Sequence, residues 1–185
     1  REEAWTWEHM ALTRARVLTG SPKARGAVES AILEVLSQPR DGPKLRADVL
    51  AMRSEMAAHK PPRGPLDAKL LRGGLVDLEF LVHYLQLRER KGLDPELVAA
   101  LTALEAEGLV PGALIDHLRL MTRILVGARL LAPDLAVPGG AAEAVLAQQT
   151  GTKDMAELLA ALDRARAAVA ASWADMFGEP LETLA

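Results

Sequence analysis

The 185-residue sequence contains no cysteine, which excludes a disulfide framework, thiolate metal sites and a thiol nucleophile. Aromatic residues make up only 3% of it, too few for the base-stacking surfaces of proteins that bind single-stranded nucleic acid. The formal net charge of −3 also disfavours nucleic acid as a partner, because such proteins usually carry a basic face. No apolar run approaches the roughly 18 residues of a membrane-spanning helix, so no membrane partner is expected either.

The residues that are present are typical of a folded globular protein, with 50% hydrophobic and 25% charged residues. Ala, Leu, Arg and Glu dominate, and the apolar residues recur with the helical period along almost the whole chain. No stretch alternates between apolar and polar residues as a strand would. The lack of cysteine alone leaves the compartment open, although it fits the reducing cytoplasm in which we expect this protein.

The apolar period and the turn residues predict eight helices, at about 3–19, 22–38, 43–59, 74–91, 95–107, 111–131, 140–150 and 153–177. Ser21 before Pro22, and Asp94 before Pro95, are typical of a capping residue followed by the first helical position. The Pro- and Gly-rich stretch 60–72 predicts an extended strap, and 132–140 an irregular loop. Since only other helices can cover each apolar stripe, we expect one all-α domain over 1–185, a bundle of about seven to eight helices without a β-sheet.

The first predicted helix carries candidate anion-binding residues. Helical spacing of about 100° per residue places Arg16 on one face with Trp5 and His9, and Glu8 lies beside that face. Arg14 lies on a second face. A guanidinium group beside tryptophan needs an anion, which is either a phosphate or carboxylate of a substrate or the carboxylate of another helix. Both interpretations stay open from the sequence.

A second candidate region surrounds Gly73 and the adjacent Gly74. Lys69 and Arg72 precede the two glycines, and the helix that follows has a partially positive amino end that could hold an anion. The alternative is a purely structural turn, because Asp77 in the first helical turn would itself occupy that positive end.

The helix that follows the two glycines is apolar around most of its circumference, apart from a polar stripe of Glu79, His83 and Gln86. Glu79 and His83 are four residues apart and are predicted to be able to hydrogen-bond each other. Such a pair is either a satisfied polar group in the core or the basis of acid–base chemistry.

No complete active site is predicted. The four histidines lie on four different segments, so no helix offers two metal-binding imidazoles. The sequence has no serine-nucleophile motif, no phosphate-binding loop and no dinucleotide-binding motif. We therefore predict no catalytic and no metal-binding residue in this chain.

Two segments resemble one family. Trp5-Thr-Trp-Glu-His-Met-Ala-Leu-Thr-Arg-Ala-Arg-Val17 is similar to the segment that follows the second nucleotidyltransferase domain of glutamine synthetase adenylyltransferases. Residues 67–80, Asp-Ala-Lys-Leu-Leu-Arg-Gly-Gly-Leu-Val-Asp-Leu-Glu-Phe, resemble that family's Lys-x-x-x-Gly-Gly-Ile-x-Asp-Ile-Glu-Phe signature. Between them lies a similar Met-Arg-x-x-Met helix (Met52, Arg53, Met56). The Trp-Thr-Trp-Glu-His form is closer to the carboxy-terminal, AMP-adding half of the family's enzymes.

The resemblance implies a parent enzyme that moves AMP from ATP to a tyrosine of glutamine synthetase, under control of glutamine and the PII signal protein. The Mg²⁺-binding Asp residues lie upstream in the family. The resemblance therefore implies a helical companion that follows an absent nucleotidyltransferase domain, inactive alone and binding neither ATP nor Mg²⁺ by itself.

Within the matching motifs, the residues best suited to contact nucleotide phosphate are Arg14, Arg16, Lys69 and Arg72. Glu8, His9, Asp77, Glu79 and His83 are motif residues or buried polar groups. An alternative is a regulatory module that docks PII or glutamine synthetase, for which we expect an exposed apolar patch rimmed by charge around 95–131.

Overall fold

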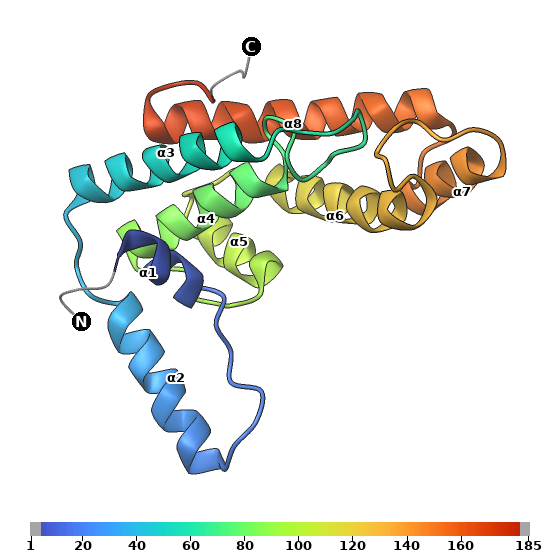
Figure 1. Cartoon of the computed structure of the whole chain (residues 1–185). Coiled ribbons are helices and arrows are strands. Elements are labelled where there is room, and N and C mark those ends of the chain that lie inside the picture. Colours follow the sequence, from blue (N-terminus) through green and yellow to red (C-terminus); the bar gives the residue numbers. More distant parts are fainter. Residues whose placement is uncertain (1–4, 182–185) are drawn as a thin grey trace. The chain divides into compact units, whose positions relative to one another are not determined.

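The computed structural model describes residues 5–181, and within that range it contains eight α-helices and no strand (Figure 1). Their bounds are α1 Thr6–Leu12, α2 Pro22–Leu36, α3 Gly42–His59, α4 Leu75–Glu89, α5 Leu97–Ala106, α6 Ala113–Leu131, α7 Ala141–Thr150 and α8 Met155–Phe177. The predicted all-α fold is confirmed. Among the described residues no helix is both long and apolar enough to cross a membrane.

The contacts divide the chain into two compact units. Unit 1 comprises residues up to 53 together with 79–111, and unit 2 comprises 54–78 together with residues from 112 onward. The expectation of one domain over the whole chain stays a prediction.

In unit 1 the greater part of α4 forms the centre of the core. Every residue from 81 to 87 is buried, because this helix is apolar on nearly all sides. Further buried side chains of the unit include Leu45 and Val49 of α3, Leu101 and Leu104 of α5, and Leu36 of α2. Thr6 of α1 donates a hydrogen bond to Asp48, which joins α1 to α3.

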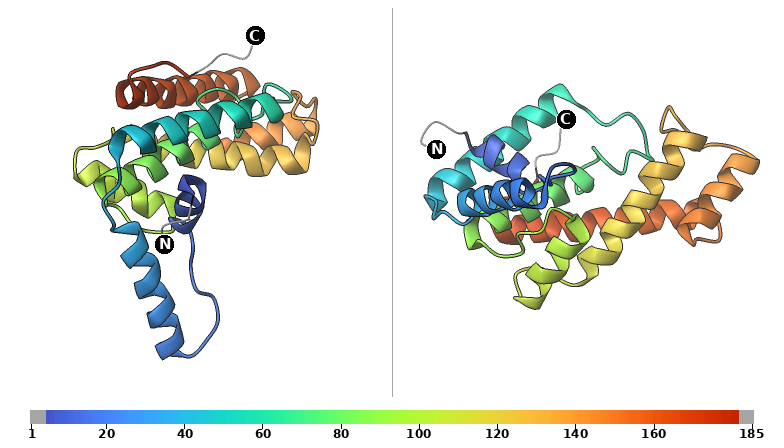
Figure 2. Two further views of the ribbon diagram at one scale, coloured as in Figure 1. Left: turned by 60° about the vertical axis from the view of Figure 1, so that its left-hand side comes forward. Right: turned by 90° about the horizontal axis from the view of Figure 1, so that it is seen from below.

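The helix α2 packs differently from the rest of unit 1. Figures 1 and 2 show it running away from α4 and α5. Ser21 caps it by accepting a hydrogen bond from the Ala24 amide at 3.3 Å, and Pro22 is its first residue, both as predicted. At the other end, the guanidinium of Arg40 donates to the carbonyls of Val35, Leu36 and Gln38 at 2.8–3.0 Å. These bonds satisfy carbonyls that the end of a helix leaves open.

In unit 2 the helices α6, α7 and α8 pack against one another. Gly127 of α6 permits the approach of α7, since a Cβ there would lie 2.6 Å from Leu146 Cδ1. Trp173 and Phe177 of α8 are buried with their ring centroids 4.3 Å apart. The other buried side chains of these helices are mainly aliphatic, among them Leu114, Leu118, Met121, Ile124, Leu158, Leu162 and Val169.

Three predicted boundaries differ from the structure. The first helix ends at Leu12 and not near residue 19, because the Thr13 side chain bonds the Met10 carbonyl and the imidazole of His83. The helix expected from 95 begins at Leu97, where the side chain of Glu96 accepts from the Ala99 amide and Asp94 accepts from the Glu96 amide.

The third difference concerns the strap predicted over 60–72, which folds into turns and bends over most of residues 64–72. The Asp67 carboxylate accepts hydrogen bonds from the amides of Arg63 and Leu70 at 3.1 and 3.0 Å, which folds the segment on itself. Leu66 is buried, and its amide donates to the Leu135 carbonyl at 3.1 Å. The loop 132–140 is irregular, as expected.

Candidate functional site

Arg14 and Arg16 both lie beyond the end of α1, in unit 1. The predicted helical face that combined Trp5, His9 and Arg16 is therefore wrong, because Arg16 is not on the helix. The two tryptophans of this segment are 71% and 55% exposed, so they do not bury a guanidinium group. Arg14 Nη1 lies 3.8 Å from Glu79 Oε2, with both side chains partly in water. An exposed ion pair of this kind adds little stability.

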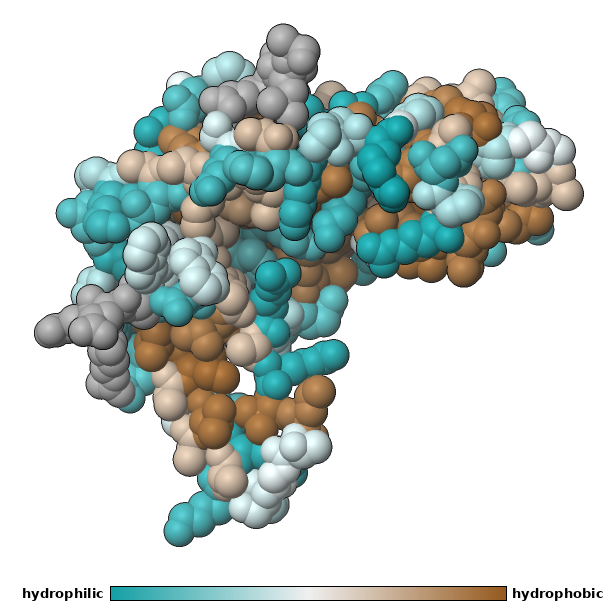
Figure 3. Space-filling view, in the orientation of Figure 1, coloured by the Kyte–Doolittle hydropathy of each residue, from teal (hydrophilic) through white to brown (hydrophobic). Residues whose placement is uncertain are grey.

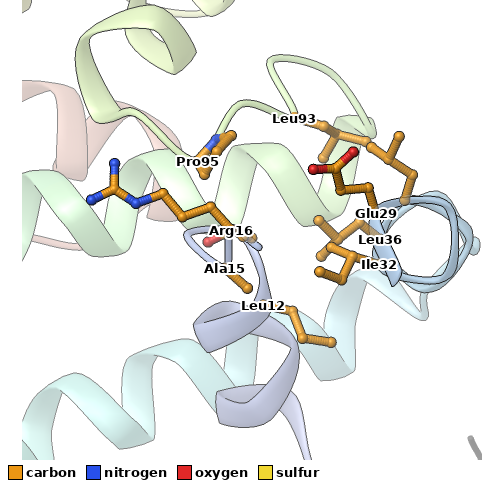
Figure 4. A pocket seen from close by; sticks show the side chains of 10 residues that line it. Leu12, Ala15, Arg16, Glu29, Ile32, Leu36, Leu93 and Pro95 are labelled. Atoms are coloured by element: carbon orange, nitrogen blue, oxygen red, sulfur yellow. The ribbon is translucent and has the colours of Figure 1, made fainter. Parts of the chain in front are cut away.

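Arg16 lines a cavity of about 310 Å³ between α2 and the segment that follows α1 (Figure 4). Its walls are mostly apolar and consist of Leu12, Thr13, Ala15, Ile32, Leu33, Leu36, Leu93 and Pro95, with Arg16 and Glu29 as the charged members. In Figure 4 the Glu29 carboxylate points toward the cavity, whereas the Arg16 guanidinium extends away from α2.

The two charged groups at this cavity make no hydrogen bond or ion pair with another residue in the described range 5–181. The cavity can thus hold an apolar group of the size of a small ligand or an inserted side chain, with one cation and one anion at its edge. Sequence reasoning missed it, because its walls come from three segments far apart in the chain.

His83 is buried, with 7% of its surface exposed, and it joins three segments of unit 1. Its Nδ1 lies 2.7 Å from Thr13 Oγ1 and 3.0 Å from Gln86 Oε1. Gln86 Nε2 donates to the carbonyls of Gly92 and Asp94, and the Thr13 hydroxyl donates to the Met10 carbonyl. Both oxygens beside Nδ1 are therefore acceptors, and this assigns the proton to Nδ1.

The consequence of this tautomer is that His83 Nε2 carries a buried lone pair without a hydrogen-bond donor among the described residues. The predicted hydrogen bond between Glu79 and His83 is wrong, because Nδ1 is taken by Thr13 and Gln86, and Glu79 faces Arg14. Of these partners, Gln86 was visible as part of the polar stripe, but no sequence signal identified Thr13.

The neutral histidine predicts a pH-dependent stability. Burial, and secondarily the charge of Arg14, hold the pKa of His83 below its usual value of 6.5, although the hydrogen bond to Gln86 acts in the opposite direction. The unfolded chain then binds the proton more readily than the folded protein. The contribution of neutral His83 to the free energy of unfolding should therefore be retained completely above pH 6.5, and it should decrease as the pH falls below that value. Chemical denaturation between about pH 8 and pH 5 measures this loss.

We expect His83→Gln to flatten that profile, while His59→Gln, at an exposed position of α3, leaves it unchanged. Some slope should remain, because burial and the nearby charge of Arg40 also lower the pKa of His9. An equally steep profile in His83→Gln would contradict the assignment.

The two remaining polar residues of α1 have local roles. Glu8 Oε2 accepts a hydrogen bond from the Trp5 amide at 2.8 Å and so caps the start of the helix. His9 is half-buried in the same turn. The contacts of these two residues give no indication that either binds a substrate.

In unit 2 the backbone amides of the turn around Gly73 donate hydrogen bonds to acceptors in the same segment of the chain. Asp77 is fully buried, and its Oδ2 accepts a hydrogen bond from the Gly73 amide at 2.6 Å. The next amides also have partners, since Gly74 donates to the Leu71 carbonyl, Leu75 to the Ala68 carbonyl and Val76 to the Lys69 carbonyl. These bonds favour the structural interpretation of the Gly-Gly turn, with the chain itself filling the amino end of α4.

Close packing explains the first glycine. Gly73 has φ +76°, and a Cβ there would lie 2.1 Å from the carbonyl oxygen of Arg166 on α8. Arg166 Nε in turn donates to the Arg72 carbonyl at 2.9 Å, and Arg72 Nε donates to the Leu181 carbonyl at 2.8 Å. Arg72 is thus bonded to the segment after α8, whereas Lys69 is exposed and its side chain makes no hydrogen bond or ion pair with a described residue.

Within residues 5–181, no three His, Asp or Glu side chains come together in an arrangement that could hold a metal ion. The structure thus brings Arg14, Glu79 and His83 into one neighbourhood of unit 1, with Arg16 at the cavity. It brings Arg72 and Asp77 to the Gly-Gly turn of unit 2, with Lys69 preceding them. The class that fold and site define is an all-α domain with charged surface residues and no metal centre among its described residues.

Comparison with curated sequences shows which protein the chain is similar to. It is 53% identical over 87 residues to the bifunctional glutamine synthetase adenylyltransferase/adenylyl-removing enzyme of Agrobacterium fabrum, a match over 47% of this chain and 9% of that enzyme. The enzyme of the same name from Xanthobacter autotrophicus is 48% identical over 103 residues, which are 56% of this chain and 10% of the enzyme.

A longer match is to the Brucella suis enzyme of that name, 38% identical over 142 residues, covering 74% of this chain and 14% of the enzyme. No family model matches the chain. The chain therefore matches a fragment of glutamine synthetase adenylyltransferase, as the two motifs predicted, and it spans only about a tenth of the length of these relatives.

Proposed function

We propose that this chain is a helical accessory domain of the adenylyl-transferring half of a cytoplasmic glutamine synthetase adenylyltransferase. In this proposal the parent enzyme moves AMP from ATP to a tyrosine of glutamine synthetase. The observation that supports it most is the 38–53% identity to enzymes of that name over up to 74% of the chain. The catalytic chemistry belongs to a nucleotidyltransferase domain upstream of the matched segment.

The residues of this chain would act by position and charge. Arg16 and Lys69 are exposed and without a charged partner among the described residues, so they are the strongest candidates to contact the triphosphate. Arg14 and Arg72 already have partners in Glu79 and the Leu181 carbonyl, but each retains further guanidinium donors. A wall of helices beside the nucleotide would also keep water from the reacting phosphate.

In the proposed parent enzyme, Mg²⁺ supplies charge neutralisation at the phosphates. The described residues do not fit such an ion, because they contain no cluster of His, Asp or Glu that could hold it. We therefore assign no Mg²⁺ ligand to this chain.

A chimera tests the accessory role. This chain replaces the corresponding region of the Brucella suis enzyme, and Arg14, Arg16, Lys69 and Arg72 are changed singly to Glu. We expect the unaltered chimera to adenylylate glutamine synthetase, and at least one of the four variants to raise the KM for ATP about tenfold, the effect of losing one charge-assisted hydrogen bond.

Lys23→Glu serves as a matched charge reversal at an exposed position of α2. It should leave the KM for ATP unchanged. Unchanged kinetics in all four test variants would contradict the phosphate contact, and an inactive but folded chimera would contradict the accessory role itself.

The alternative function, a docking module for PII or glutamine synthetase, is favoured by one feature of α6. Val126 and Leu130 are 53% and 76% exposed, and Arg119, Arg123 and Arg129 lie on the same exposed side of that helix. Apolar residues rimmed by charge are typical of protein interfaces. Calorimetric titration of the chain with PII, with and without glutamine, tests it, and micromolar binding that is lost in Leu130→Asp would support this role over the first.

A further inference from the structure

The helix α2 exposes apolar side chains that a folded protein normally covers. Every residue from 21 to 31 is exposed, and Leu36 is the helix's buried residue. Val28 is 48% exposed and Leu33 is 47% exposed. Figure 3 shows this as hydrophobic surface over part of α2.

Many apolar side chains of α2, Val28 among them but not Leu33, share one face. At about 100° per residue, five of them fall within an arc of about 100° centred near Val28 and Val35. We call this set the α2 strip, and it consists of Ala24, Val28, Ala31, Ile32 and Val35. The opposite face carries Lys23, Ser30 and Glu34 together with Leu33. An isolated helix of this length is marginal in water, and amphipathic helices gain most of their stability when the apolar face is covered.

The size of the strip decides what covers it. A helix of 15 residues is about 22 Å long, so a strip about 10 Å wide offers roughly 200 Å². Two such strips fall far short of the roughly 1,200 Å² that a stable complex of separate molecules buries. A surface in the same polypeptide has an effective concentration near millimolar, and a small contact then suffices.

In the curated relatives the matched segment is 9–14% of the enzyme, so most of each polypeptide lies outside it. Resting on the proposed function, we propose that the α2 strip is the surface on which the nucleotidyltransferase domain of the same enzyme docks. The contacting surface of that domain must be apolar opposite Val28.

The charged residues and the cavity next to the α2 strip indicate which groups the docked domain should present. Arg25 borders the strip beside Ile32, and it has no ion-pair partner in the described part of the chain, so an acidic group belongs opposite it. Glu29 lies on the cavity side of α2, where a basic group belongs. The cavity next to the strip, at about 310 Å³, accepts an apolar side chain from the docked domain.

The absence of cysteine makes a labelling test direct. Val28→Cys in the strip and Ser30→Cys on the opposite face are each placed in the 185-residue chain and in the Brucella suis chimera. The rate of alkylation at each introduced thiol is then measured by mass spectrometry. We expect Val28→Cys to react at least tenfold more slowly in the chimera than in the chain alone, and Ser30→Cys to react at similar rates in both.

Ala128→Cys, a fully buried position on α6, should resist alkylation in both proteins and so verifies that each is folded. Equal rates at Val28→Cys in the two folded proteins would overturn the proposal. So would protection already present in the chain alone that grows with concentration, since the occupant would then be a second copy. Adenylylation is assayed separately, so an inactive chimera with Val28→Cys protected would reject the proposed function and keep the docking surface.

Discussion

Changing Gly73 to alanine should destabilise the protein by about 3 kcal/mol, of which roughly 1–2 kcal/mol comes from the left-handed backbone and the rest from overpacking. The φ of +76° is costly for a side chain, and the added Cβ would lie 2.1 Å from the Arg166 carbonyl oxygen and 2.8 Å from its carbon. Both atoms are backbone, so rotation of a side chain cannot relieve the clash. Urea unfolding followed by circular dichroism measures the effect.

Gly26→Ala is the matched control for this substitution. Gly26 lies inside α2, and a Cβ added there would have no neighbouring heavy atom within 4 Å, so alanine should stabilise the protein by about 0.5–1 kcal/mol. If Gly73→Ala unfolded at the same urea concentration as the unchanged chain, the close approach of the turn to α8 would be refuted.

Replacing Asp77 by alanine should cost about 2–3 kcal/mol, because it leaves the buried Gly73 amide without its acceptor. The carboxylate is fully buried and receives that amide at 2.6 Å. Asp77→Asn retains an oxygen of similar position and size, so we expect it to lose clearly less. The same unfolding experiment compares the three proteins.

The difference between the two Asp77 variants separates the hydrogen bond from the charge. Equal losses in Asp77→Ala and Asp77→Asn would mean that the negative charge, and not the hydrogen bond to Gly73, stabilises the turn. No loss in either variant would mean that the turn does not depend on this side chain.

Local signals in the sequence predicted the helices well. Ser21 and Pro22 define the start of α2 because a cap acts within a few residues, and the apolar circumference of α4 placed it in a core. The end of α1 was not predictable, because Thr13 bonds to His83, seventy positions further along the chain. The partner of Glu79 was not predictable either, because it also comes from a distant part of the chain. Residue spacing suggested that Glu79 would pair with His83, whereas in the structure it lies next to Arg14.

The candidate site shows a similar division. The motif around Gly73 predicted a special turn, and its capping by Asp77 was among the expected alternatives. The cavity beside Arg16 was not foreseen, since its walls require the fold of α2 over the segment after α1. Only the arrangement in space shows which of the charged residues are already engaged.

The engaged amides at the start of α4 have a consequence for ionic strength. Because Asp77 and the loop carbonyls already take these amides, an anion that approaches the turn meets only the side-chain charges of Lys69 and Arg72. Attraction between exposed charges fades over a Debye length of about 10 Å at 0.1 M salt. Any nucleotide affinity contributed by this turn should therefore weaken steadily as potassium chloride is added, whereas a cradle of directed backbone donors would be far less sensitive.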